Sequence, residues 1–136
     1  MSRFPPPLGR ALITVASVAA FSVTPKSAMC AATKAWTLSF SRSLAGEVLH
    51  KRVLVQALCP GFTFTEFPDV LPDGKFDRAS IPRFLWMDAD EVVAASLRGL
   101  EKGRVVAIPG FRNRIMTSLA GTRLAAAVSR RFGRKT

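Results

Sequence analysis

The chain has 136 residues, of which 49% are apolar and 21% charged, and its formal net charge is +11. This composition is typical of one packed domain and argues against a disordered chain. One histidine and two cysteines, Cys30 and Cys59, without a CxxC pair, are too few for a zinc site of side chains within one chain. The sequence allows a disulfide between the two cysteines, but the simpler interpretation is that both stay reduced in the cytosol.

The positive charge is concentrated at the two ends of the chain. Residues 1–52 carry seven basic residues (Lys or Arg) and one acidic residue. Residues 53–103 carry five basic and eight acidic residues, and residues 104–136 carry eight basic residues and no acidic one. The last third therefore predicts attraction to a polyanion, such as nucleic acid, an anionic membrane surface or a phosphate-bearing ligand.

The N-terminal segment allows two interpretations. Residues 1–10 form a proline-containing lead-in with two arginines, and an apolar run follows over residues 11–21. A basic lead, a short apolar run and small residues resemble a secretory signal, with residues 1–28 removed from an exported small protein. The run is too short to span a bilayer. We favour the second interpretation, in which the run is a buried strand of a cytoplasmic protein.

The first half of the chain predicts a strand followed by a helix. Residues 11–17 are apolar and partly β-branched without clean alternation, which is typical of a parallel strand covered on both faces. Residues 27–48 carry small and apolar residues at helical spacing and predict a long helix. The residues expected to allow close packing of this helix are Ala31, Ala35, Leu38 and Ala45.

The alternation continues in the second half. Residues 52–58 predict a second buried strand, and a loop punctuated by proline and glycine extends to about residue 82. A helix near residues 90–101 follows, with an aspartate, Asp88 or Asp90, as its N-cap. The helix should close at Gly103, before a third short strand over residues 104–110.

The order of these elements predicts the fold class. Strands that alternate with helices of crossover length form a parallel sheet, so residues 11–110 should adopt an α/β, three-layer, Rossmann-like fold with about three strands. Ligands of such sheets bind beyond the carboxyl ends of the strands. Residues 111–136 should form a separate basic segment, with an amphipathic helix over residues 111–132.

Four features occur in order near the predicted strand ends. Ser17 closes the first strand, Cys30 and Lys34 follow on the helix, and the segment PGFTFT at 60–65 follows the second strand. A spacing of four places residues 30 and 34 on one helical face. This combination resembles the C-terminal half of a short-chain dehydrogenase/reductase, a family with Ser, then Tyr-x-x-x-Lys, then Pro-Gly-x-x-x-Thr at these places.

The resemblance implies catalytic roles for three residues. Ser17 would hydrogen-bond the substrate carbonyl or alcohol, the residue at position 30 would transfer a proton to or from the substrate oxygen, and Lys34 would assist it. It also implies a cofactor, NAD or NADP, whose nicotinamide ribose Lys34 would bind. The remaining expected cofactor contacts are Pro60, Gly61, Thr63 and Thr65.

The sequence departs from the family pattern at two places. Position 30 is Cys30 instead of tyrosine, and the chain contains no tyrosine at all. A thiol is shorter than a phenol and a weak hydrogen-bond donor, so the acid/base role is expected to be empty. The sequence also lacks the glycine-rich turn that cradles a pyrophosphate. We therefore interpret the chain as a fragment without the N-terminal dinucleotide-binding half, inactive and with weak or lost cofactor binding.

The leading functional hypothesis is an NAD(P)-dependent oxidoreductase that acts on an alcohol or carbonyl. An apolar small-molecule substrate is indicated by the aromatic loop 66–87, which contains Phe67, Phe76, Phe84, Leu85 and Trp86. Family resemblance implies homo-oligomer contacts through helix 27–48, and the first strand should present an open apolar edge that favours self-association. The alternatives are a small basic module that binds a membrane surface through its C-terminal helix or, less favoured, nucleic acid, and the exported protein.

Overall fold

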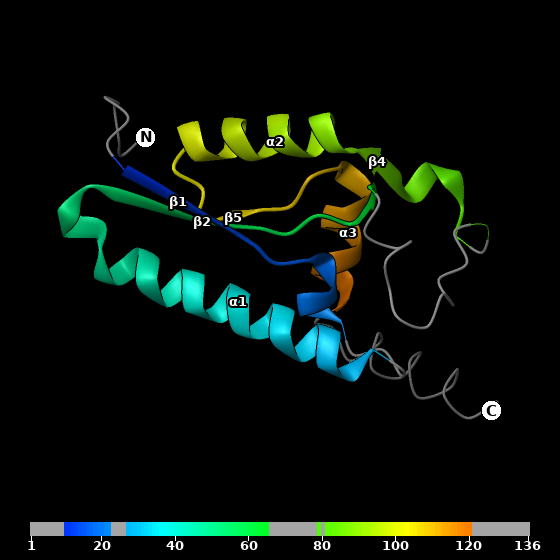
Figure 1. Cartoon of the computed structure of the whole chain (residues 1–136), viewed down its shortest axis with the longest axis horizontal. Helices are drawn as coiled ribbons and strands as arrows, with labels where there is room; N and C mark the ends of the chain where they lie inside the picture. The colour runs from blue at the N-terminus through cyan, green and yellow to red at the C-terminus, as the bar shows by residue number, and fades with distance from the viewer. Residues whose placement is uncertain (1–9, 23–26, 66–78, 80, 121–136) are drawn as a thin grey trace.

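The computed structural model describes residues 10–22, 27–65, 79 and 81–120 of the chain (Figure 1). The longer helices and the strands of the main sheet alternate along it as the sequence predicts, and short strands and 3₁₀ helices occur between them. In chain order they are β1 (Arg10–Val15), η1 (Val18–Phe21), α1 (Ala28–Glu47), η2 (Leu49–Lys51), β2 (Val53–Leu58), β3 (Phe62–Phe64), η5 (Arg83–Leu85), β4 (Trp86–Asp88), α2 (Ala89–Glu101), β5 (Val106–Ala107) and α3 (Phe111–Ala120).

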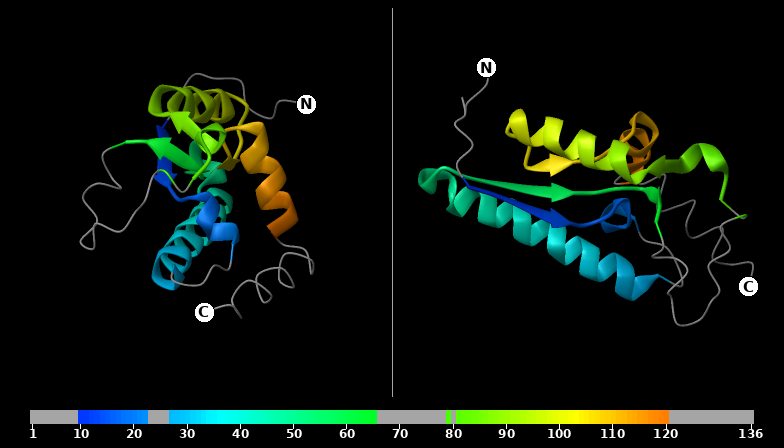
Figure 2. Two further views of the ribbon diagram at one scale, coloured as in Figure 1. Left: turned by 90° about the vertical axis from the view of Figure 1, so that its right-hand side faces the viewer. Right: turned by 45° about the horizontal axis from the view of Figure 1, so that its top comes forward.

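The main sheet is parallel and has the strand order β1-β2-β5. β1 and β2 pair over six positions, from Arg10 opposite Val53 to Val15 opposite Leu58. β5 pairs only with the end of β2, where Leu58 lies opposite Ala107. Helix α1 covers one face of the sheet and α2 the other (Figures 1 and 2). The predicted α/β, three-layer class is therefore confirmed, and the parallel strands end at one common edge.

The central strand β2 contributes side chains to both layers. Successive strand residues point to opposite faces, so Ala57 and Leu58 enter different cores. One core contains Ala16, Leu38, Ala57 and Cys59, and the other contains Leu58, Val92 and Ala107. Burial on both faces explains why residues 52–58 are almost continuously apolar, and the predicted second strand is confirmed with bounds 53–58.

A buried polar contact joins β2 to α2. The side chain of Gln56 is fully buried. Its Oε1 accepts a hydrogen bond of 2.6 Å from Ser96 Oγ, and its Nε2 donates to the backbone oxygens of Ser96 and Arg104 at 3.2 Å each. Because every polar atom of this amide has a partner, it fixes α2 on the sheet without an unsatisfied group.

Strand β1 differs from the prediction in its burial. It covers residues 10–15 instead of 11–17, and five of its six residues are exposed. The exposed fractions of Leu12, Ile13 and Val15 are 40%, 37% and 59%. The expectation of a strand covered on both faces is wrong, because within the described part of the chain β1 pairs only with β2 and leaves its other edge open. The open apolar edge expected at this strand is present.

The helices follow the predicted bounds closely. α1 covers residues 28–47 against the predicted 27–48, and Leu38 is buried as expected, although Ala35 is exposed. Asp88 is the N-cap residue of α2, and Gly103 follows that helix with a φ of 65° that favours glycine.

Other predicted segments are shorter than expected or lie partly outside the described residues. The third strand covers only 106–107 of the predicted 104–110. α3 is described over residues 111–120, and the rest of the predicted helix 111–132 lies outside the described residues. The lead-in before residue 10, Phe67 and Phe76 also lie outside them.

A second, two-stranded parallel sheet replaces part of the predicted loop. β3 pairs with β4, Phe62 opposite Trp86 and Phe64 opposite Asp88. The Trp86 ring stacks on Phe64 with a centroid distance of 4.9 Å and lies 5.6 Å from Phe62. Trp86 is thus a buried packing residue of this small sheet.

Among the residues that the structure describes, no helix combines the length and the apolar character needed to cross a membrane.

Candidate functional site

The carboxyl ends of β1 and β2 bring two of the predicted site segments together. The Ala16 N–H donates to the Leu58 oxygen at 2.8 Å, and the Val18 N–H donates to the Pro60 oxygen at 3.0 Å. Ser17 lies between these two bonds. The residues after β1 therefore run beside the Pro-Gly segment after β2, at the edge where parallel sheets bind ligands.

Ser17 is the N-cap of the short helix η1. Its Oγ accepts a hydrogen bond of 3.1 Å from the Ala19 N–H. A hydroxyl that accepts one hydrogen bond still has a proton to donate. Ser17 is held in one orientation by this contact and can donate to a carbonyl or alkoxide oxygen of a ligand.

Helix α1 brings Lys34 to the same edge of the sheet. The Lys34 Nζ donates a hydrogen bond of 3.1 Å to the backbone oxygen of Val15, two residues before Ser17. An ammonium group has three donors, and this is the one hydrogen bond that the structure records for it within the described ranges. The Lys34 charge is thereby fixed beside the strand end with donors left for a ligand.

Cys30 lies on the first turn of α1, one helical turn before Lys34, and is exposed. Its backbone oxygen accepts from the Thr33 hydroxyl at 3.0 Å. Within the described part of the chain, the structure records no hydrogen bond of its thiol. The four-residue spacing places Cys30 and Lys34 on one side of the helix.

The Pro60-Gly61 segment is held from several sides. The Thr63 Oγ1 donates to the Gly61 oxygen at 3.1 Å, and the Val18 N–H binds the Pro60 oxygen as described above. A Cβ on Gly61 would lie 2.6 Å from Nδ2 and 2.7 Å from Oδ1 of Asn113. Glycine at position 61 thus permits the Asn113 amide to lie directly against the backbone.

Asn113 is a residue of this site that the sequence did not reveal. Its side chain, 5% exposed, donates from Nδ2 to the Pro109 oxygen at 2.9 Å and contacts the Met87 sulfur at 3.8 Å. It stands between two arginines in a segment that resembles a solvated basic helix. Nothing in the local pattern indicates its contact with Gly61, which is far away in the sequence.

The two threonines of the PGFTFT segment differ in their surroundings. Thr63 lies within β3 and is half-buried, with its hydroxyl committed to Gly61. Thr65 follows β3 and is exposed.

The second cysteine is buried beneath the site. Cys59 is fully buried in the core against α1. Burial raises the pKa of its thiol from 9.0 to about 11, while the Arg42 guanidinium and the Ser17 backbone N–H act in the opposite direction. A thiol with this pKa stays protonated at neutral pH and is a packing group rather than a nucleophile.

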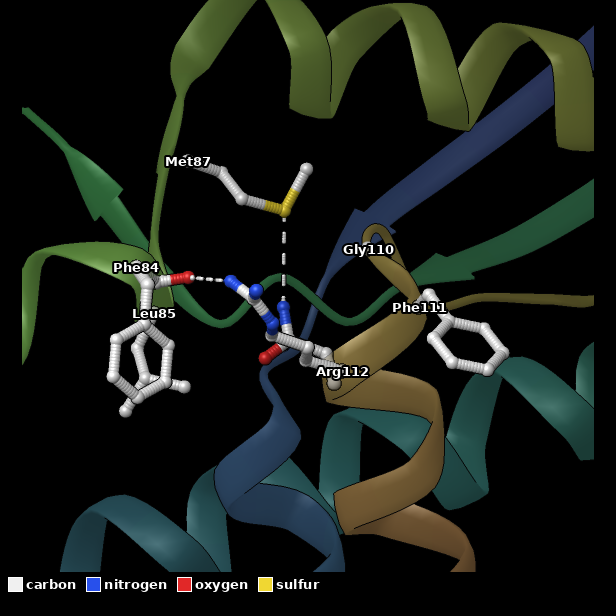
Figure 3. Close-up of a pocket in the computed structure, with 7 residues that line it drawn as sticks. Phe84, Leu85, Met87, Gly110, Phe111 and Arg112 are labelled. Atoms are coloured by element: carbon white, nitrogen blue, oxygen red, sulfur yellow. Dashed lines mark hydrogen bonds between the residues drawn. The ribbon is translucent and has the colours of Figure 1, made fainter.

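A cavity of about 390 Å³ lies between η5, β4 and the start of α3 (Figure 3). Arg112 crosses it, donating from Nη1 to the Phe84 oxygen at 2.9 Å with its guanidinium 5.0 Å from the Phe84 ring centroid. Asn113 connects the cavity to Gly61. The cavity is lined by Phe84, Leu85, Met87, Gly110, Phe111, Arg112 and Asn113.

In the described residues no group of three or more His, Cys, Asp or Glu side chains could hold a metal ion.

The sequence is similar to a known enzyme family. The family profile described as short chain dehydrogenase matches residues 9–74. A 3-oxoacyl-(acyl-carrier-protein) reductase of Rattus norvegicus is 32% identical over 106 residues, which cover 75% of this chain and 44% of that enzyme. The chain thus spans less than half the length of this curated relative.

Solved structures show the same likeness. A short-chain dehydrogenase from Burkholderia cenocepacia J2315 in complex with NADP is 29% identical with a TM-score of 0.69, covering 88% of this chain and 46% of that one. A short-chain dehydrogenase from Sphingobium yanoikuyae in complex with NADPH is 30% identical with a TM-score of 0.62, and the match covers 87% of this chain and 44% of that one. The similarity therefore extends over most of this chain.

Proposed function

Because the chain belongs to the short-chain dehydrogenase/reductase family, we propose that its strand-end site is the nicotinamide and substrate side of an NAD(P)-dependent oxidoreductase. The reaction class would be the interconversion of an alcohol and a carbonyl. The observation that carries this proposal is the convergence of Ser17, Lys34 and Pro60-Gly61 at one edge of the parallel sheet. The relatives with NADP and NADPH support the choice of cofactor class.

The residues present fit one end of such a cofactor. Bound NAD or NADP would supply or accept a hydride at its nicotinamide ring. Lys34 has an ammonium, fixed beside Val15, whose remaining donors suit the hydroxyls of the nicotinamide ribose. Gly61, without a side chain, suits close approach of the ring to the backbone, and Thr63 and Thr65 are proposed as further contacts. No glycine-rich turn for the pyrophosphate is found in the sequence, so binding by this chain is proposed to be weak.

The residues that face the substrate would hold it but not complete a proton transfer. Ser17 can donate its hydroxyl proton to a substrate oxygen, and Lys34 adds positive charge where negative charge develops. Cys30 occupies the position of the family's acid/base group with a shorter side chain and a weak donor. General acid–base catalysis contributes about 10²- to 10⁴-fold. We therefore propose that the chain has little or no activity.

The substrate proposal is an apolar carbonyl or alcohol. Two predicted substrate-loop residues, Phe84 and Leu85, line the cavity that Asn113 connects to Gly61. The rat relative is named as a reductase of a 3-oxoacyl group, which is consistent with a carbonyl substrate here.

A chimaeric enzyme tests the proposed roles. Residues 10–136 would replace the corresponding region of the Burkholderia dehydrogenase, and NADPH oxidation would be followed with a panel of apolar ketones. With Cys30 the rate should be near background, and Cys30→Tyr should raise kcat about 100-fold or more. Lys34→Met in the tyrosine variant should raise the KM for NADPH and lower kcat. A Cys30→Tyr chimaera that folds and binds NADPH without any gain in rate would contradict the assignment of position 30.

We also propose that α1 forms contacts between copies of the chain. Trp36 and Phe40 stack with centroids 5.3 Å apart and are 68% and 43% exposed, and Met29 on the same helix is 78% exposed. Exposed apolar residues of this size are typical of an interface. Trp36→Ser with Phe40→Ser should shift the chain toward monomer in sedimentation velocity, whereas Val93→Ser on α2 should not.

A cytoplasmic location is part of the proposal. Removal of residues 1–28 as a signal would delete β1 and its six paired positions with β2. The fold thus favours retention of this segment. Mass spectrometry of the chain expressed in bacteria should find the N-terminal segment present, and a mature form that starts near residue 29 would contradict this location.

A further inference from the structure

Helix α3 carries an apolar surface on its outer side. Phe111, Ile115, Met116 and Leu119 are 74%, 44%, 46% and 56% exposed. Their spacing of four, one and three residues places them on one side of the helix. The opposite side packs on the protein through Asn113, which is buried. α3 is therefore fixed along one side and presents an apolar stripe on the other.

The start of this stripe points away from the cavity. In Figure 3 the Phe111 ring lies on the far side of α3 from Phe84 and Met87. Phe111 is one of the residues that line the cavity, yet 74% of its surface is exposed. A single exposed apolar residue is ordinary, but a contiguous group on one helix indicates a binding surface.

Two arginines of α3 are held by neutral backbone oxygens, Arg112 across the cavity and Arg114 at the start of the helix. Arg112 donates from Nη1 to the Phe84 oxygen, and Arg114 donates from Nε to the Ile108 oxygen at 3.0 Å. Both acceptors are neutral carbonyls, so neither of these bonds pairs the guanidinium with a carboxylate. Residues 104–136 contain eight basic residues and no acid.

We infer that α3 docks on an anionic lipid membrane surface, a binding site independent of the proposed oxidoreductase function. An amphipathic helix with apolar residues on one side and arginines beside them lies in the plane of the headgroups. Its apolar side chains enter the acyl boundary while its charges meet acidic lipids.

The charge pattern distinguishes this partner from two others. A second copy docked through α3 would bring two basic segments together, which the charge repulsion opposes. Nucleic acid would attract the arginines, but it has no use for a stripe of Phe, Ile, Met and Leu. A lipid surface uses both the charge and the apolar side chains.

Vesicle co-sedimentation of the full chain tests the inference. The chain should pellet with vesicles of phosphatidylserine and phosphatidylcholine, should bind pure phosphatidylcholine at least about tenfold more weakly, and should be released by salt. Ile115→Ser with Met116→Ser should weaken binding at least about tenfold. Arg114→Gln alone should weaken it on the order of fivefold. The matched control is Val93→Ser with Leu97→Ser on α2, where the exposed fractions of 53% and 49% are similar, and it should bind as the parent does.

Three results would overturn the inference. The first is no pelleting with anionic vesicles although circular dichroism shows folded protein. The second is a loss of vesicle binding in the α2 control as large as that in the α3 variants, which would assign binding to general hydrophobicity. The third is retention of vesicle binding in the α3 variants, with loss of self-association or of duplex DNA binding instead, which would assign α3 to a second copy or to nucleic acid.

Discussion

Replacement of Gly61 by alanine probes the contact that joins the Pro-Gly segment to α3. The new Cβ would lie 2.6 Å from Nδ2 and 2.7 Å from Oδ1 of Asn113, well inside van der Waals contact. Asn113 can withdraw only by losing its buried hydrogen bond of 2.9 Å to the Pro109 oxygen. Overpacking costs about 1–3 kcal/mol, and a lost buried hydrogen bond costs about as much. Gly61→Ala should therefore lower the free energy of unfolding by about 2–3 kcal/mol.

Urea unfolding followed by circular dichroism measures this effect, and two further variants make it specific. Gly46→Ala is the matched control, because a Cβ there meets nothing within 4 Å, and alanine favours a helix, so no stability should be lost. Asn113→Ala removes the obstructing amide. Combined with Gly61→Ala it should cost less than the sum of the two single changes by at least about 1 kcal/mol. Additive costs, or a Gly61→Ala variant as stable as the Gly46→Ala control, would refute the close contact.

Three other predictions concern the buried Gln56 network and the two cysteines. Gln56→Leu removes the amide that binds the Ser96 hydroxyl and the backbone oxygens of residues 96 and 104. It should lower the free energy of unfolding by about 2–4 kcal/mol in the same urea assay. A loss below about 0.5 kcal/mol would contradict the buried network. Maleimide should label exposed Cys30 rapidly in the native chain and fully buried Cys59 only with unfolding, and equal labelling rates followed by mass spectrometry would disprove this placement. Burial raises the pKa of the Cys59 thiol from 9.0 to about 11, so the unfolded chain loses this proton at a lower pH than the folded chain does. The free energy of unfolding should therefore keep its full value below about pH 9 and fall by up to about 3 kcal/mol as the pH rises to about 11. Cys59→Ala should remove this decline.

The sequence predicts the layered fold because the central strand satisfies two cores at once. Apart from Gln56, residues 53–58 are apolar on both faces, since Ala57 packs against α1 and Leu58 against α2. β1 has similar residues but is exposed. Apolar composition shows that a strand is suited to burial on both faces. Whether it is buried depends on neighbouring elements, which the described residues do not supply for β1.

The short elements could not be predicted for a different reason. β3 and β4 have three residues each, too few for a periodic pattern to emerge. Their pairing depends on the contact of Trp86 with Phe62 and Phe64, which joins segments that are distant in sequence. The same applies to Asn113, whose role is visible only once α3 lies against Gly61.

Ser17, Lys34 and the Pro-Gly segment were predicted as site residues from the resemblance to the family, and the structure brings them to one edge of the sheet. Lys34 reaches the backbone of Val15 because a helix that begins at residue 28 after a crossover brings its second turn beside the end of β1. The spacing of these residues does not say which ligand they bind, and a ligand experiment tests that proposal.

Titration of the isotopically labelled full chain with nicotinamide mononucleotide, followed by amide NMR shifts, tests the central proposal most directly. Shifts should change at Ser17, Val18, Lys34 and Gly61, and the changes should vanish in Lys34→Met. Adenosine 2′,5′-bisphosphate, the other end of NADP, should leave these amides unaltered. An unchanged spectrum at millimolar nicotinamide mononucleotide, or changes confined to residues away from the ends of β1 and β2, would contradict a nicotinamide site at this edge of the sheet.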